Sequence, residues 1–158
     1  MSNNAVYLTR EKLAELEAQL KELKTKGRQE AARKLAEARS HGDLSENSEY
    51  DAAKEEMAML ELRIAQLEQT LSRTRVMDPN EVRTDKIYIF SKVKVQDLLS
   101  NKILEYQLVS TEEADIVNGK ISTDSPIGKG LLGKTVGDVV SVQVPSGVKQ
   151  YRILEINK

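Results

Sequence analysis

The chain has 158 residues, 31% of them charged and 39% hydrophobic, and its formal net charge at pH 7 is -1. It contains no cysteine, which excludes disulfide bonds, thiolate metal sites and thiol nucleophiles and fits a reducing compartment. No apolar run has the length of a membrane span, and the polar start lacks the core of a signal peptide, so we expect a soluble cytoplasmic protein without a membrane partner.

The first predicted element is a helix that starts after Thr9. The Thr9 hydroxyl is a suitable N-cap because it can accept a hydrogen bond from an unpaired amide of the first turn. An apolar stripe then recurs at steps of three and four, weakens at Gly27 and Glu30, and resumes with smaller residues. Its members are Leu13, Leu16, Leu20, Leu23, Ala31, Leu35 and Ala38. Gly42 can adopt the left-handed geometry that ends such a helix.

A second predicted helix carries the a/d seam of a coiled coil, with apolar residues at strictly alternating steps of three and four. These residues are Tyr50, Ala53, Met57, Leu60, Ile64, Leu67 and Leu71. Two such helices joined by a short link must lie antiparallel. At 1.5 Å per residue, roughly thirty residues give an arm of about 45 Å. Alanines near the tip predict a slimmer rod there, a shape suited to a narrow passage.

The charges divide unevenly between the two arms. Residues Lys21 to Arg39 include seven Lys or Arg and three Glu, a net charge of +4, whereas Asp43 to Glu61 include seven acids and one Lys, a net charge of -6. One interpretation is solvated helix faces with pairs at i to i+4 spacing. The other is a basic strip that meets nucleic acid beside an acidic tip that meets cations.

The heptad pattern stops near Thr74, and Asp78-Pro79-Asn80 cannot continue a helix. We therefore predict a coiled-coil hairpin domain over residues 1–77 and a second domain over residues 78–158. Period-two patterns in the second domain predict strands at 87–90, 93–95, 103–109, 140–144 and 151–156, with a hairpin turn at 145–147. Ser125 followed by Pro126 predicts a short helix closed by Gly133. The expected fold class is α+β: a helical hairpin followed by a small antiparallel β domain with one helix and an aliphatic core.

The link between the two long helices carries the candidate chemistry. Asp43 and Glu46 have the spacing of a capping box, in which each side chain bonds the backbone of the other's turn. They also form a pair of carboxylates, the ligand type that Mg²⁺ prefers when water and phosphate oxygens complete its shell. Two carboxylates alone make a weak site, so a metal role would need ligands from a partner.

The neighbours of this pair allow two interpretations each. His41, the only histidine, fits an interaction with the last helix carbonyls better than a metal site. Tyr50 could stack on a base, although its place in the heptad series favours the seam. Arg39 and Lys54 flank the tip on opposite arms, where they are either ordinary surface charges or two cations facing one groove.

Two long motifs carry a resemblance to a known family. The run from Glu37 to Tyr50, with Gly42-Asp43-Leu44-Ser45-Glu46-Asn47 at its centre, and the run from Ile121 to Lys134 resemble the bacterial transcript cleavage factors of the Gre family. Within that family the chain is more similar to the GreA type than to the more basic GreB type, because its pI is about 6.0. Ser48, where alanine is common, and the stretch from Phe90 to Asn101 depart from the pattern.

The resemblance implies a function for these residues. The C-terminal domain would be similar to FK506-binding proteins and would dock on the rim of the RNA polymerase secondary channel through Asp124, Ser125 and Pro126. The hairpin would pass down the channel to the displaced 3' end of a backtracked RNA. There Asp43 and Glu46 would stabilise a Mg²⁺ ion shared with the polymerase, and Arg39 and Lys54 would contact the RNA. The chain would then be an activator of polymerase-catalysed RNA cleavage, not an enzyme, and a monomer when free.

Two rival functions stay open from the sequence. A secondary-channel inhibitor of related fold would block the polymerase without promoting cleavage, and the Asp43-x-x-Glu46 spacing favours the cleavage type over it. A structural or chaperone-like hairpin with a prolyl isomerase domain is the other, and the few aromatic residues disfavour it. No Gly-rich phosphate loop, zinc pattern or Ser/His/Asp set is present, so a self-contained hydrolase is not expected.

Overall fold

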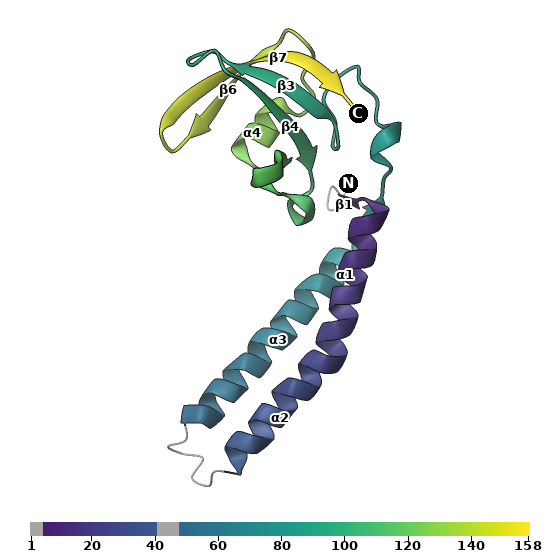
Figure 1. Ribbon diagram of the computed structural model, residues 1–158, viewed down its shortest axis with the longest axis vertical. Helices are drawn as coiled ribbons and strands as arrows, with labels where there is room; N and C mark the ends of the chain where they lie inside the picture. Colours follow the sequence, from purple (N-terminus) through teal and green to yellow (C-terminus); the bar gives the residue numbers. More distant parts are fainter. Residues whose placement is uncertain (1–4, 41–47) are drawn as a thin grey trace. The chain divides into compact units, whose positions relative to one another are not determined.

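The computed structural model describes residues 5–40 and 48–158 (Figure 1). The chain divides into two compact units, which we call the hairpin unit, Glu11–Thr74, and the sheet unit, Met1–Arg10 with Arg75–Lys158. Strand β1 (Val6–Leu8) forms a two-stranded sheet with β2 (Thr74–Val76). Sequence patterns did not predict these two strands, because three residues are too few to establish a period.

The hairpin unit consists of two helical arms, as predicted. The first arm runs through α1 (Arg10–Glu22), a π turn η1 (Leu23–Gly27) and α2 (Arg28–Arg39), and the second arm is α3 (Ser48–Ser72). Helices α2 and α3 lie side by side (Figure 1). Every residue of the predicted seam is buried or half-buried. The seam is slimmer toward the link, where its buried residues are Ala31, Ala38 and Ala53, than toward the base, where they are Leu16, Ile64 and Leu67.

The π turn explains why the apolar stripe weakens in the first arm. Leu23, Gly27, Ala31 and Leu35 follow at three successive steps of four, one residue more than a heptad pattern allows. A π turn inserts one residue into an α-helix, so the seam after it returns to the same face. Gly27 faces the second arm, and a Cβ atom there would lie 3.2 Å from Leu60 Cδ1. Within the turn, the Thr25 hydroxyl donates to the Lys21 carbonyl at 2.8 Å.

The sheet unit is built on a five-stranded sheet in the order β5-β4-β3-β7-β6. Its strands are β3 (Lys92–Asp97), β4 (Ile103–Val109), β5 (Lys120–Ser122), β6 (Val139–Val144) and β7 (Gly147–Asn157). The predicted turn joins β6 to β7, since Val144 pairs with Gly147 across Pro145 and Ser146. Our expectation of a wholly antiparallel sheet is wrong at one edge, because β4 and β5 run parallel. Two 3-10 turns, η3 (Thr111–Glu113) and η4 (Ile116–Asn118), and Gly119 at φ 75° return the chain in the same direction.

The predicted strand at residues 87–90 is also wrong. This segment forms no ladder, and Phe90 adopts a left-handed backbone with φ 72°. The Ile87 amide donates to the Lys134 carbonyl at 2.8 Å and the Phe90 amide to the Leu108 carbonyl at 2.6 Å. The apolar run that suggested a strand instead contains two buried side chains, Ile87 and Phe90, that are each only 1% exposed.

Helix α4 (Pro126–Leu131) covers one face of the sheet and closes its core (Figure 1). Ser125 is its N-cap, as predicted, and Gly133 has φ 83° just after its end. The core is mainly aliphatic, as expected, with Tyr151 as its buried aromatic residue. Its members are Ile87, Val93, Val95, Leu108, Ile121, Leu131, Val140, Val142, Tyr151, Ile153 and Ile156. Within residues 5–40 and 48–158, no helix combines the length and apolar character needed to cross a membrane.

Candidate functional site

The predicted acidic pair, Asp43 and Glu46, lies outside the described residues, as does His41. The link that contains them joins the end of α2 at Arg39 to the start of α3 at Ser48. Their carboxylates are hard oxygen donors, so the chemistry of this donor set fits Mg²⁺ when further ligands are supplied. Among residues 5–40 and 48–158, no group of three or more His, Asp or Glu side chains could hold a metal ion.

Arg39 and Lys54, the two predicted RNA contacts, meet at one aromatic ring next to the link. The Arg39 guanidinium carbon lies 5.8 Å from the centre of the Tyr50 ring, and the Lys54 ammonium nitrogen lies 5.4 Å from it. Both distances are within the range of cation–π attraction. The structure thus places a cation from each arm at one ring, and we call this group the tip cluster (Arg39, Tyr50 and Lys54).

The remaining charges of the arms are largely paired with one another. Three ion pairs join the arms: Lys24 Nζ to Glu68 at 3.0 Å, Arg28 to Glu61 at 2.9 Å, and Lys34 Nζ to Glu56 at 3.2 Å. Hydrogen bonding between Arg28 and Glu61 raises the pKa of Arg28 and lowers the pKa of Glu61. These pairs confirm that the helices are antiparallel, since partners early in one arm are late in the other.

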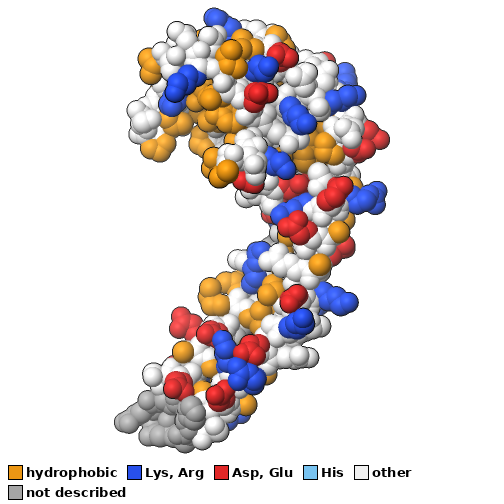
Figure 2. Space-filling view, viewed as in Figure 1, with side chains coloured by type: hydrophobic (Ala, Val, Ile, Leu, Met, Phe, Trp, Pro, Cys, Tyr) orange, Lys and Arg blue, Asp and Glu red, His pale blue; other side chains and the backbone are white. Residues whose placement is uncertain are grey.

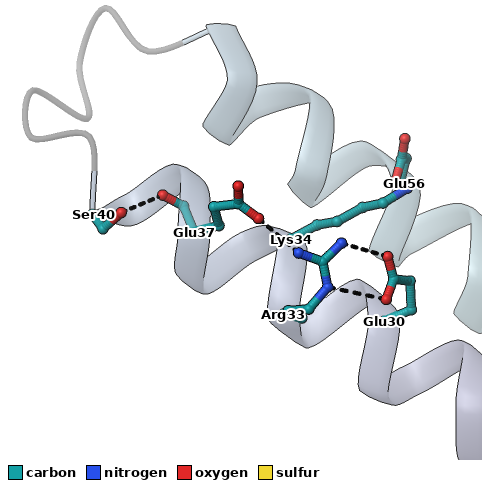
Figure 3. Close-up of polar contacts among 6 residues, drawn as sticks. All are labelled: Glu30, Arg33, Lys34, Glu37, Ser40 and Glu56. Atoms are coloured by element: carbon teal, nitrogen blue, oxygen red, sulfur yellow. Dashed lines mark hydrogen bonds and ion pairs between the residues drawn. The ribbon is translucent and has the colours of Figure 1, made fainter.

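Arg33 makes a second kind of pair, within its own arm. Its guanidinium bonds both oxygens of Glu30, at 2.6 and 3.1 Å, and Glu37 at 2.7 Å, while Lys34 reaches across to Glu56 (Figure 3). Acidic and basic side chains accordingly intermingle on the visible face of the hairpin unit (Figure 2). The interpretation of the charges as solvated helix faces with paired side chains therefore accounts for most of them. Over their described residues, the arms do not present a continuous basic strip.

The predicted docking residues sit on the turn that leads into α4. The Ser125 hydroxyl accepts the Gly128 amide at 3.0 Å and donates to the Ser122 carbonyl at 2.6 Å. Asp124 is exposed, its amide donates to Ser122 Oγ at 3.0 Å, and its carboxylate accepts the Thr111 hydroxyl at 3.2 Å. Pro126 is exposed at the first position of the helix. The turn is thus held by side chains and presents a carboxylate and a proline ring to solvent.

Sequence reasoning missed Thr111 and Ser122, whose hydroxyls lie 2.8 Å apart and support this turn. It also missed Gly128, where an added Cβ would lie only 2.0 Å from the Ser122 carbonyl oxygen. The contact between Thr111 and Ser122 depends on the parallel pairing of β5 with β4, and no local pattern in the sequence indicates that pairing. The spacing of serine and glycine in residues 122–128 was the one sequence feature that could have indicated a tightly packed turn there.

Comparisons with known proteins match both units. Residues 6–76 match the family described as transcription elongation factor, N-terminal, and residues 82–158 match the family described as transcription elongation factor, GreA/GreB, C-terminal. Among curated relatives, transcription elongation factor GreA of Chloroherpeton thalassium is 50% identical over 154 residues, with 98% of each chain covered. GreA of Chlorobium phaeobacteroides, strain DSM 266, is 52% identical over 155 residues, also with 98% of each chain covered.

Solved structures include similar chains as well. The crystal structure of GreA factor homolog 1 (Gfh1) of Thermus thermophilus is 37% identical, covers 98% of this chain and 99% of its own, and has a TM-score of 0.44. The GreA/GreB factor from Nitrosomonas europaea is 30% identical, covers 68% of this chain and 94% of its own, and has a TM-score of 0.43.

Proposed function

This chain belongs to the GreA/GreB family of transcription elongation factors, and from that premise we propose that it rescues arrested RNA polymerase. It binds polymerase, extends its hairpin through the secondary channel and stimulates endonucleolytic cleavage of backtracked nascent RNA. The observation that carries the proposal is the match to both family models over nearly the whole chain, with Asp43 and Glu46 in the link between the arms.

The hairpin supplies reach and position. Helix α3 has 25 residues, which at 1.5 Å per residue makes a rod of about 38 Å. Cross-arm ion pairs and the apolar seam hold the arms together along this length. Such a rod can carry the link between the arms to a defined distance from the base, and positioning of reacting groups contributes several kcal/mol to lowering a barrier.

Asp43 and Glu46 act as ligands that the polymerase lacks by itself. Their carboxylates would hold Mg²⁺ jointly with oxygens of the polymerase and the RNA, and would orient the attacking water by accepting its hydrogen bonds. When bound, the metal supplies charge stabilisation and activation of water. Because two carboxylates do not complete a metal shell, the chain is an activator of polymerase and not an enzyme.

Arg39 and Lys54 bind the extruded RNA near its 3' end. Their charges gather at the tip cluster, whereas most other bases of the first arm are paired with acids. Cations that replace counterions on phosphates bind in a salt-dependent manner that does not read sequence. The pair therefore holds the RNA backbone whatever the base composition of the backtracked segment.

The sheet unit anchors the factor on the rim of the secondary channel through Asp124, Ser125 and Pro126. The turn is ordered by the Ser125 cap and the Thr111 hydroxyl, so little conformational entropy is lost when a partner binds it. The exposed carboxylate suits a basic partner surface. We propose that the protein acts there as a monomer, in the cytoplasm where its polymerase works.

The decisive experiment is RNA cleavage in purified backtracked elongation complexes. Wild type should release short 3' fragments, while Asp43→Asn and Glu46→Gln should abolish release and keep polymerase affinity. Asp51→Asn, which alters an exposed acid in the first turn of α3, is the matched control and should cleave as wild type does. Binding of polymerase without any cleavage by wild type would instead identify a secondary-channel inhibitor.

Docking is tested separately by affinity. Asp124→Ala and Pro126→Ala should weaken binding to polymerase, because they remove the exposed groups of the turn. Asp138→Ala is a suitable control, since Asp138 is an exposed acid in a different turn of the sheet unit. Equal affinities for all of these variants would show that the docking surface lies elsewhere.

A further inference from the structure

The Tyr50 ring occupies an unusual place for a seam residue, because it is half-buried and has a cation from each arm beside it. We propose that Tyr50 is a positioning residue that holds the Arg39 guanidinium and the Lys54 ammonium together so that they meet the RNA backbone as a pair. This inference rests on the proposed function, and it assigns to Tyr50 a role distinct from seam packing and from base stacking.

Local helical structure fixes the backbone positions of Arg39 and Lys54. Tyr50 and Lys54 are four residues apart on α3, so their side chains lie on the same face of that helix. Arg39 is the last residue of α2, and that end is closed by Ser40, whose amide donates to the Ala36 and Glu37 carbonyls at 3.1 Å. The Ser40 hydroxyl also donates to the Glu37 carbonyl at 2.6 Å (Figure 3). Only the side-chain ends remain to be positioned.

An aromatic ring is suited to this task for an electrostatic reason. Two cations brought to one place repel each other, and long Lys and Arg side chains in water would otherwise spread over many rotamers. The negative face of a tyrosine ring attracts both cations. Unlike a carboxylate, the ring carries no net charge, so it does not neutralise them. The pair therefore keeps its full positive charge for an anionic ligand.

Seam packing alone does not require tyrosine at this position. The adjacent seam residues Ala38 and Ala53 are small and buried, and leucine or methionine fills the half-buried seam positions elsewhere, as at Leu35, Met57 and Leu60. A leucine at position 50 would preserve an apolar contact but would present no ring to the cations. This difference separates a packing role from a positioning role.

The test compares Tyr50→Phe, which keeps the ring, with Tyr50→Leu and Tyr50→Met, which keep an apolar side chain. In backtracked complexes, we expect the Tyr50→Phe variant to retain cleavage activity close to that of wild type. The two aliphatic variants should raise the factor concentration for half-maximal cleavage by about two- to thirty-fold, the equilibrium equivalent of a cation–π contact. They should also lessen the salt dependence of that concentration. Wild-type behaviour of both aliphatic variants would overturn the proposal.

A mutant cycle distinguishes positioning from direct stacking on a base. If Tyr50 acts through the cations, replacing it should have little further effect in an Arg39→Ala, Lys54→Ala background. If it stacks on RNA itself, the loss should be as large as in the wild-type background, and the proposal is then wrong. Thermal unfolding and polymerase affinity of each variant establish that the hairpin and the docking surface are intact.

An observation without polymerase keeps this test independent of the proposed function. In the free protein, NMR ring-current shifts of the Arg39 and Lys54 side-chain protons should be present in wild type and Tyr50→Phe and lost in Tyr50→Leu. Absence of these shifts in wild type would overturn the positioning role. A wild-type protein that shows the shifts but does not stimulate cleavage would instead refute the proposed function.

Discussion

Replacing Gly128 by alanine should disrupt the sheet unit although the residue lies in a helix, where alanine is normally favoured by about 0.5–1 kcal/mol. The added Cβ would lie 2.0 Å from the Ser122 carbonyl oxygen and 3.0 Å from Ser125 Oγ. Relief requires a backbone shift of more than about 1 Å, because carbon and oxygen atoms in contact are normally separated by over 3 Å. That shift would also disturb the Ser125 cap.

We expect the cost of this overpacking to exceed the gain in helix propensity, with a net loss of about 2–3 kcal/mol. For a domain of this size, such a loss corresponds to a fall of roughly 10–20 °C in the unfolding midpoint. Differential scanning calorimetry measures it directly, and the transition of the hairpin unit serves as an internal reference.

Gly130→Ala is the matched control, since it adds the same methyl to the same helix. Its Cβ would meet only the Val142 side chain, at 3.1 Å, and a side-chain methyl can give by the few tenths of an ångström needed. The unfolding free energy of this variant should stay within about 1 kcal/mol of wild type. A Gly128→Ala protein as stable as wild type, or a control equally damaged, would refute the steric argument.

Three further predictions concern the two units. Deleting Gln29 should leave the hairpin's thermal midpoint nearly unchanged, because the deletion removes the one extra residue that the π turn accommodates. Deleting Ala58 should instead abolish cooperative unfolding, because it turns the apolar seam of α3 on one side of the deletion by about 100° away from the first arm. Equal effects of the two deletions in thermal unfolding followed by circular dichroism would contradict this. Hydrogen bonds from backbone amides lower the pKa of the buried Asp97 carboxylate, so its stabilisation is present above the unfolded pKa and lost as pH falls through the lower folded pKa. The urea midpoints of wild type and Asp97→Ala should therefore converge as the pH falls below the ordinary range of an aspartate pKa, and a constant gap would exclude this origin. Arg28→Ala should lower stability slightly at low salt and not at about 1 M salt, because the pair with Glu61 is exposed; a salt-independent loss would point to packing instead.

The hairpin could be predicted from the sequence because its fold depends on local periodicity. Steps of three and four place one apolar face on each arm, and a short link leaves only the antiparallel arrangement. Burial of Leu16, Ile64 and Leu67 follows from that pattern alone. The same holds for Ser125 and Pro126, whose capping chemistry involves residues within one turn.

The sheet unit was harder to predict because its key contacts are long-range. Ile87 and Phe90 belong to a short apolar run typical of a strand, but their amides bond residues more than fifteen positions away. The parallel pairing of β5 depends on η3 and η4, two turns with no distinctive sequence pattern. A period-two pattern tells which side chains are buried and leaves the partner strand undetermined.

The tip cluster shows how both kinds of information combine at the candidate site. A strict heptad continued from Gly27 would place Glu30, Lys34 and Glu37 in the seam, all of them charged. Burying three charged side chains is far costlier than one π turn, so the chain takes the extra residue there and Ala38 becomes the buried position. Arg39 then follows directly after a seam residue and lies beside Tyr50 of the other arm. The position of Arg39 next to the acidic link thus follows from the position of the π turn η1. No motif in the link itself predicts it.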